Sequence, residues 1–262
     1  MKHNLGIILI LVGLFLGAQV IGLLVTDKYL VKELPYKIQR PQLEPKTSFV
    51  PIFTIILIAT LLAFVLMKFK AVKLWLFWFF LSVFLTMTIS FSAFMKESFA
   101  IILALILAGI KIFKREVFTH NFTELFIYGG LAAIFVPILS LLSISILLIL
   151  ISIYDFIAVW KTQHMVKLAK YQITKLKIFA GLIIPYGKKR QAILGGGDIG
   201  FPLLFSGVIL RDFGLIESLI VSLVTALALF GLLYFGRKNK FYPAMPYLSA
   251  GCFLGYLIIL FI

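Results

Sequence analysis

The stretch ILISIYDFIAVW, residues 149–160, is apolar along most of its length and carries one carboxylate, Asp155. A second apolar stretch, ILGGGDIGFPLLF at residues 193–205, carries Asp198. The other eight of the ten acidic residues lie in predicted loops or within a few residues of a segment end, so no other carboxylate is embedded so deeply in apolar sequence. An ionisable group in a bilayer core costs roughly 2.5–3.5 kcal/mol on insertion scales, which makes it a candidate for function. Two such groups on neighbouring segments indicate a catalytic or ion-carrying pair.

The composition predicts an integral membrane protein. Of the 262 residues, 62% are apolar and 13% are charged, against about 45–50% and about 25% in soluble domains. The net charge of +15 could suit a nucleic acid, but the basic residues lie in short loops between apolar runs. That pattern is typical of cytoplasmic loops beside anionic lipid headgroups. We therefore expect membrane lipids as partners and no nucleic acid.

Apolar runs near the length of about 20 residues that a spanning helix needs predict an all-α, polytopic fold with about nine transmembrane helices. The predicted spans are 5–25, 50–67, 74–95, 98–113, 122–136, 138–160, 192–210, 215–235 and 243–262. The fifth and sixth are separated only by Val136-Pro137, where proline can end one helix and start the next. The first run is longer than a secretory signal, so we expect it to be retained.

The basic residues also orient the chain. Most of the 25 lysines and arginines lie in loops on the side of the N-terminus, above all in the long connection 161–191. The opposite side holds only the basic residues of loop 26–49 together with Lys96 and Arg211. This bias predicts a cytoplasmic N-terminus and an external C-terminus in the cell membrane. We interpret 161–191 as a basic linker that lies along the headgroups.

This topology brings the two aspartates to a similar depth. Asp155 lies shortly before the predicted cytoplasmic end of span six, and Asp198 follows Arg190 into span seven, so a helical rise of 1.5 Å per residue places each roughly 8–12 Å inside the boundary. Consecutive spans are commonly neighbours. Two close carboxylates share a proton, so one can act as a general base on water while the other polarises a carbonyl. The site then needs a polar cavity between the two spans and no cofactor.

Glycines and prolines surround the candidate pair. The glycines of residues 195–197 permit close backbone approach before Asp198, although simple helix packing also explains them. The segment 243–246, PAMP, suits an ordinary helix start or an extended strand that could pair with an unwound substrate. His164 has no His or Cys partner at ligand spacing, so we expect no metal.

Three motifs in this order resemble those of presenilin and signal peptide peptidase, the intramembrane aspartyl proteases with YD, GxGD and PAL motifs. The matching residues are Tyr154-Asp155, Gly195-Gly196-Gly197-Asp198 and Pro243-Ala244-Met245-Pro246. The resemblance implies a presenilin-like fold with Asp155 and Asp198 as the catalytic dyad. It further implies that Tyr154, Gly195 and Gly197 shape the site and that the terminal motif engages substrate. Met245 replaces the family's leucine, and Gly196 stands at the variable position.

The implied function is an intramembrane aspartic endopeptidase that unwinds and cleaves single-span transmembrane helices or signal peptides near their cytoplasmic ends. Residues 1–137 would then form a scaffold and a substrate route, and residues 138–262 would carry the catalytic motifs. The sequence shows no partner subunit and is compatible with a homo-oligomer. The compact size and short loops favour an archaeal homologue.

Two other functions fit some of the same residues. A proton- or cation-coupled transporter or channel also uses buried aspartates, but it predicts an inverted repeat that is not evident in this sequence. A prepilin-peptidase-like protease also uses GxGD, but the position of its partner aspartate differs and it lacks the terminal PAL-like motif.

Overall fold

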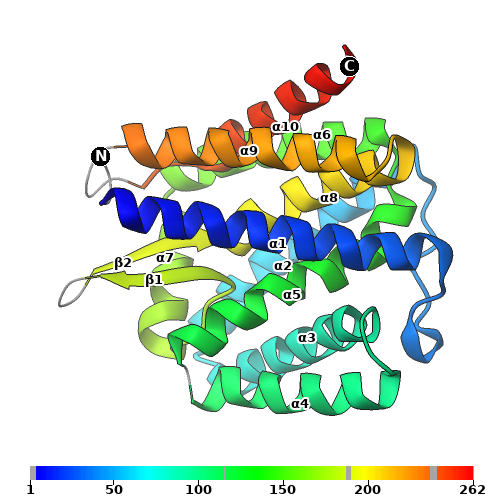
Figure 1. Ribbon diagram of the computed structural model, residues 1–262. Coiled ribbons are helices and arrows are strands. Elements are labelled where there is room, and N and C mark those ends of the chain that lie inside the picture. The colour runs from blue at the N-terminus through cyan, green and yellow to red at the C-terminus, as the bar shows by residue number, and fades with distance from the viewer. Residues whose placement is uncertain (1–3, 115, 187–189, 237–240, 262) are drawn as a thin grey trace.

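The computed structural model describes residues 4–114, 116–186, 190–236 and 241–261, and most of them are helical (Figure 1). Helices are expected in long apolar runs because backbone groups in lipid must be paired within the chain. The helices are α1 Leu5–Val31, α2 Phe49–Lys68, α3 Val72–Ser92, α4 Glu97–Phe113, α5 Val117–Phe135, α6 Leu141–Phe156, α7 His164–Tyr171, α8 Gly196–Asp212, α9 Leu215–Phe235 and α10 Met245–Ile259. Short 3₁₀ turns cover Pro35–Lys37 and Val136–Ile138.

Each predicted span overlaps one of these helices, with differences at the ends. Within the described residues, six helical segments are long and apolar enough to cross a membrane, namely α1, α2, α3, α9 and the two segments built on α5 and α6. The helices α4, α8 and α10 have 17, 17 and 15 residues. The all-α, multi-pass architecture is therefore confirmed, and the count of nine spans stays a prediction.

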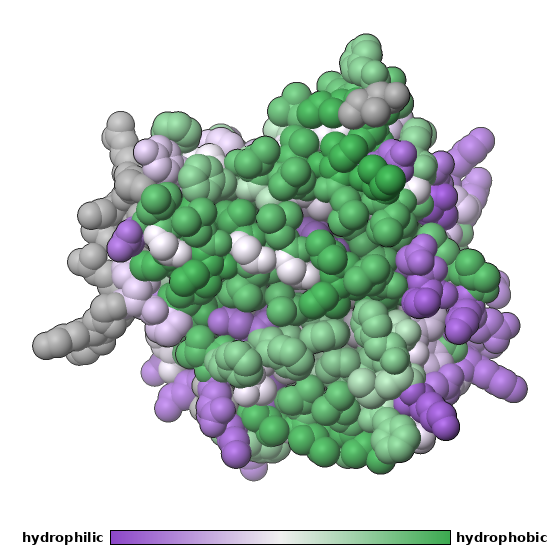
Figure 2. All heavy atoms as spheres, viewed as in Figure 1, coloured by the Kyte–Doolittle hydropathy of each residue, from purple (hydrophilic) through white to green (hydrophobic). Residues whose placement is uncertain are grey.

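The outer surface is that of a protein solvated by lipid. Figure 2 shows apolar side chains covering the middle of the visible face, with hydrophilic residues gathered towards its two sides. Large apolar side chains such as Leu61 on α2 and Phe77 on α3 are 66% and 59% exposed. A soluble monomer rarely exposes so extensive an apolar surface.

The connection 161–191 is more structured than a basic linker. It contains α7, a π-helical turn at Gln172–Leu176 and strand β1, Gly181–Tyr186. Strand β1 pairs antiparallel with β2, Arg190–Gly195. Leu182 and Leu194 face each other in this register and are buried in the main core.

The hairpin corrects the predicted start of span seven. The residues from 190 to 195 are a strand and not a helix, so α8 begins at Gly196 and Asp198 is its third residue. A strand rises about 3.3 Å per residue. A helical rise from Arg190 therefore does not apply, and the depth of Asp198 in the membrane stays a prediction, although the aspartate does lie at the predicted end of its helix.

Helix α1 contributes to the centre of the protein. It lies against α5, α8 and α9, and its side chains Leu11 and Phe15 are fully buried. Figure 1 shows the N-terminus and the hairpin at one end of the molecule and the C-terminus at the other. Which end is cytoplasmic stays a prediction. Several of the basic residues on which this predicted orientation rests lie outside the described residues: Lys2, Arg115, Lys188, Lys189, Arg237, Lys238 and Lys240.

Candidate active site

Asp155 lies near the end of α6, just before a π-helical turn at Ile157–Lys161. Its Oδ2 accepts a hydrogen bond from the N–H of Met245 at 3.1 Å, and the backbone of Ala244 contributes another. Met245 is the first residue of α10 and Ala244 is its N-cap. The first N–H groups of a helix lack intrahelical partners and carry partial positive charge. Asp155 therefore caps α10, and this contact joins the YD and PAL-like motifs directly.

The PAL-like motif is a helix start. Pro246 lies in the first turn of α10, and Ala244 has φ −84° and ψ −33°. The alternative of an extended strand through the motif is therefore wrong. Trp160 Nε1 also donates to the carbonyl of Phe241 at 3.2 Å, which holds the segment before α10 against the π-helical turn that follows α6.

Asp198 is the third residue of α8, and its Oδ2 accepts a hydrogen bond from the N–H of Gly195 at 3.2 Å. Gly195 is the N-cap and has an extended backbone. A carboxylate at this position commonly caps its own helix. Both aspartates are thus held by backbone N–H groups at helix N-termini, Asp155 at that of α10 and Asp198 at that of α8.

The two aspartates lie at the same end of the bundle. Helices α6, α8 and α10 contact one another, and Asp155 lies in the last turn of α6 while Asp198 lies in the first turn of α8. Both side chains are half-buried. The fold thus joins the YD and PAL-like motifs by a hydrogen bond and places the GxGD motif on a helix that contacts the helices of both.

Gly196 and Gly197, two of the glycines before Asp198, have different surroundings. A Cβ on Gly196 would lie 3.0 Å from the Tyr128 hydroxyl and 3.3 Å from the carbonyl oxygen of Ala180. A Cβ on Gly197 would meet nothing closer than the Phe201 ring at 3.5 Å, and Gly197 is exposed. The position that the resemblance leaves variable is therefore closely packed in this chain.

Tyr154 contacts the start of the connection 161–191. Its hydroxyl forms a hydrogen bond with Nε2 of His164 at 3.1 Å, and Nδ1 of His164 bonds the Thr162 hydroxyl. Burial lowers the pKa of His164 below its ordinary value. Among the described residues, no group of three or more His, Cys, Asp or Glu side chains could hold a metal ion.

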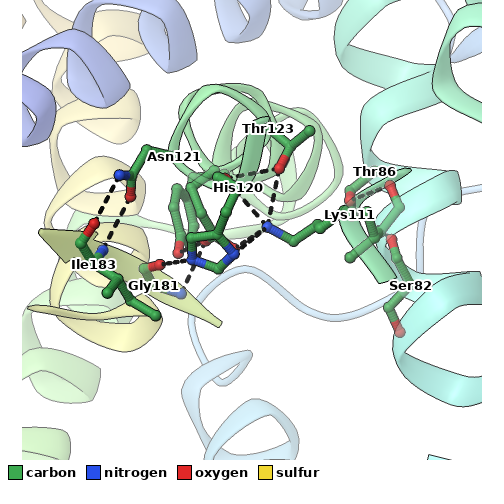
Figure 3. A network of polar contacts seen from close by, with 11 residues as sticks. Ser82, Thr86, Lys111, His120, Asn121, Thr123, Gly181 and Ile183 are labelled. Carbon is green, nitrogen blue, oxygen red and sulfur yellow. Dashed lines mark hydrogen bonds and ion pairs between the residues drawn. The ribbon is translucent and has the colours of Figure 1, made fainter. Parts of the chain in front are cut away.

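The sequence did not reveal the most deeply buried carboxylate. Glu124, on α5, is 1% exposed, although the sequence places it within a few residues of the end of a predicted span. Its Oε1 accepts from Lys111 Nζ at 2.7 Å, and its Oε2 accepts from the N–H of Gly181 at 3.0 Å and from the Tyr128 hydroxyl. Figure 3 shows Lys111 beside His120 and Thr123, next to strand β1. The signal available in the sequence was Lys111, a lysine inside the fourth apolar run, which needs a buried partner of opposite charge.

Gln19 was also missed. It lies fully buried in α1, and its Nε2 donates to the carbonyl of Ile199 at 3.0 Å. This bond fixes α1 to the first turn of α8, directly after Asp198. An isolated amide within the first apolar run could have drawn attention to it.

A cavity of about 360 Å³ lies between α9 and α10 and is lined mainly by small and apolar side chains, with Tyr242 and Tyr247 among them. Neither aspartate lines this cavity. The polar cavity expected between the helices of Asp155 and Asp198 stays a prediction.

Comparison with known proteins gives a family and a fold. The family model described as signal-peptide peptidase, presenilin aspartyl protease matches residues 12–191, a range that includes Asp155 and ends before Asp198. Two solved structures of a presenilin family intramembrane aspartate protease, in different crystal forms, are each 21% identical to this chain. Their TM-scores are 0.70 and 0.66, over 96% and 98% of this chain and 97% of each solved chain. No curated protein sequence matches.

Proposed function

Because the chain belongs to the family of signal-peptide peptidases and presenilin aspartyl proteases, we propose that Asp155 and Asp198 are its two catalytic carboxylates. The protein is an intramembrane aspartic protease with the presenilin fold. The hydrogen bond from the backbone of the PAL-like motif to Asp155 supports the residue assignment most directly. The two carboxylates also lie at the same end of contacting helices. Family membership favours this function over a transporter and over a prepilin-peptidase-like enzyme.

The proposed reaction is general acid–base hydrolysis of a peptide bond. The ionised carboxylate takes a proton from a water whose oxygen attacks the carbonyl carbon, while the protonated carboxyl group donates a hydrogen bond to the carbonyl oxygen. Collapse of the tetrahedral intermediate breaks the C–N bond, and a proton passes to the leaving amine. The N–H groups of Met245 and Gly195 hold one oxygen of each aspartate, so both side chains are positioned before substrate arrives.

The proposed substrates are single transmembrane helices, including signal peptides. A peptide bond inside a helix is hydrogen-bonded and shielded, so the substrate must unwind before hydrolysis. The β1–β2 hairpin supports the proposal that the unwound substrate pairs with the edge of a strand. Asn121 bonds both the N–H and the carbonyl of Ile183, and Pro185 has no N–H to offer, so the outer edge of β1 is largely closed. Strand addition would then use the edge of β2, which leads to Asp198.

The protein is a multi-pass membrane protein. We further propose a cytoplasmic N-terminus and an external C-terminus, which places both aspartates near the cytoplasmic boundary and predicts cleavage there. Residues 1–137 serve as scaffold and substrate route, and residues 138–262 carry the catalytic motifs. Contact with lipids and assembly into a homo-oligomer remain part of this proposal.

Peptidase assays on the purified full chain in proteoliposomes test the assignment. The substrate is a fluorogenic peptide with one transmembrane helix, and mass spectrometry of its products gives the cleavage position. Asp155→Asn and Asp198→Asn should abolish turnover. Asp212→Asn is the matched control, because Asp212 is a partly exposed aspartate paired with Arg211 at the far end of α8. Turnover in both active-site variants equal to that of the wild type would contradict the proposal.

A further inference from the structure

Glu124 joins three elements through one buried carboxylate. Lys111 on α4 binds its Oε1, and the N–H of Gly181 on β1 binds its Oε2. Both charged side chains are 1% exposed. Burial of an ion pair contributes little net stability, because desolvation offsets most of the attraction. The pair therefore invites an explanation other than stability.

One route leads from Glu124 through the hairpin to Asp198. Gly181 lies opposite Gly195 in the register of the two strands. Gly195 is the N-cap of α8, and its N–H binds the carboxylate of Asp198. Fixing Gly181 therefore fixes the residue that holds Asp198. His120 strengthens the attachment, since its Nε2 bonds the carbonyl of Gly181 at 2.8 Å.

A second route passes through Tyr128. The Tyr128 hydroxyl donates to Oε2 of Glu124, one helical turn earlier on α5. The same hydroxyl faces Gly196, and the Tyr128 ring faces Gly200, where an added Cβ would lie 3.6 Å away. Glu124 thereby sets the orientation of the side chain against which the first turn of α8 rests.

We propose that Glu124 is a positioning residue for Asp198. It acts as a hydrogen-bond acceptor that fixes the hairpin and Tyr128, and through them the start of α8. Lys111 balances the charge of this acceptor in a buried site. The inference rests on the proposed function, in which Asp198 is one of the two catalytic carboxylates.

Two double variants separate the acceptor from the charge. Lys111→Met with Glu124→Gln removes both charges and keeps a side-chain carbonyl that can accept from Gly181 and Tyr128. Lys111→Met with Glu124→Leu has nearly the same volume and charge but no acceptor. We expect the Gln variant to keep kcat within about threefold of the wild type and the Leu variant to lose about 10–100-fold, with little change in KM, because a displacement of about 1 Å is enough to disturb a catalytic group.

Amide hydrogen exchange on the same proteins, measured by mass spectrometry, supplies a readout that does not depend on activity. Strands β1 and β2 should exchange faster in the Leu variant than in the Gln variant, while α9 and α10 exchange alike in both. Equal kcat in the two variants, or a loosened hairpin with full activity, would overturn the inference. Equal loss of kcat in both would also overturn it, since the charge and not the acceptor would then matter.

Tyr128→Phe tests the second route and keeps the ion pair, so it stays informative if the Leu variant does not fold. Loss of the hydroxyl should lower kcat by about 3–10-fold, and an unchanged kcat would overturn this route. Asp198→Asn distinguishes a failure of the proposed catalytic dyad from a failure of the proposed role of Glu124. An active Asp198→Asn enzyme would refute the proposed dyad, whereas an inactive one with fully active Glu124 variants would refute only the role of Glu124.

Discussion

Alanine at Gly196 and alanine at Gly197 should change stability in opposite directions. Both glycines lie in the first turn of α8. An added Cβ at Gly196 would meet the Tyr128 hydroxyl at 3.0 Å and a backbone carbonyl at 3.3 Å. Neither neighbour yields easily, because the hydroxyl is bound to Glu124 and the carbonyl belongs to the chain before β1. At Gly197 the nearest atom is 3.5 Å away.

The magnitudes follow from helix propensity and packing. Replacing glycine by alanine in a helix gains about 0.5–1 kcal/mol. Gly197→Ala should keep most of this gain, whereas overpacking at Gly196 costs about 1–3 kcal/mol. The free energies of unfolding of the two variants should therefore differ by about 1–3 kcal/mol. For a chain of this size, that corresponds to a difference in Tm of roughly 2–12 °C.

The assay is thermal unfolding of both variants in the same detergent, followed by intrinsic fluorescence. Peptidase activity should fall in Gly196→Ala, because α8 must shift at the residue that precedes Asp198 by one half-turn. Repeating the pair with Tyr128→Phe should reduce the penalty at Gly196, as expected for two groups in contact. The packing argument is refuted if the two variants have equal Tm, or if Gly196→Ala is the more stable.

Three further predictions concern other parts of the chain. Gly130→Ala should lower the unfolding free energy by at least about 1–3 kcal/mol, because a Cβ there would clash with the backbone carbonyl of Thr86. Gly109→Ala is the control: an added Cβ would meet nothing within 4 Å, so this variant should be neutral or stabilising in the same thermal assay. Met245→Leu should leave kcat within about twofold of the wild type, since Asp155 binds the N–H of this residue, and a large loss of kcat would contradict that. Burial lowers the pKa of His164 in the folded protein. The contribution of His164 to stability should therefore be complete above its ordinary pKa of about 6.5 and should fall as the pH drops towards the lower folded pKa. Between pH 7.5 and 5 the Tm of His164→Gln should decline less than that of the wild type, and identical slopes would contradict this prediction.

The sequence predicted the features that depend on local pattern. Long apolar runs mark the helices, and an embedded carboxylate such as Asp155 marks a candidate site without any knowledge of the fold. The hairpin was not predicted because β1 lies in the connection interpreted as a basic linker, and the apolar residues of β2 continue into a run that also fits a helix. The pairing of Leu182 on β1 with Leu194 on β2 distinguishes a strand from a helix here.

The supporting residues of the site depend on tertiary contacts. The predicted span starts at residue 122, which puts Glu124 near its end, whereas α5 begins at Val117. The earlier start buries Glu124 and brings it to Lys111. Similarly, motif order suggested that Asp155 and the PAL-like segment belong together, but the bond is made by the backbone of Met245, which no side-chain pattern specifies.

The central claim is that Asp155 and Asp198 act as one hydrolytic unit. The most direct test compares single-turnover cleavage of one transmembrane peptide by Asp155→Asn, Asp198→Asn and the double variant, all checked for an unchanged Tm. If the two carboxylates act together, each single variant should lose nearly as much rate as the double variant, because groups that act as a unit are strongly non-additive. Losses that simply multiply, or a single variant that keeps wild-type turnover, would contradict the account.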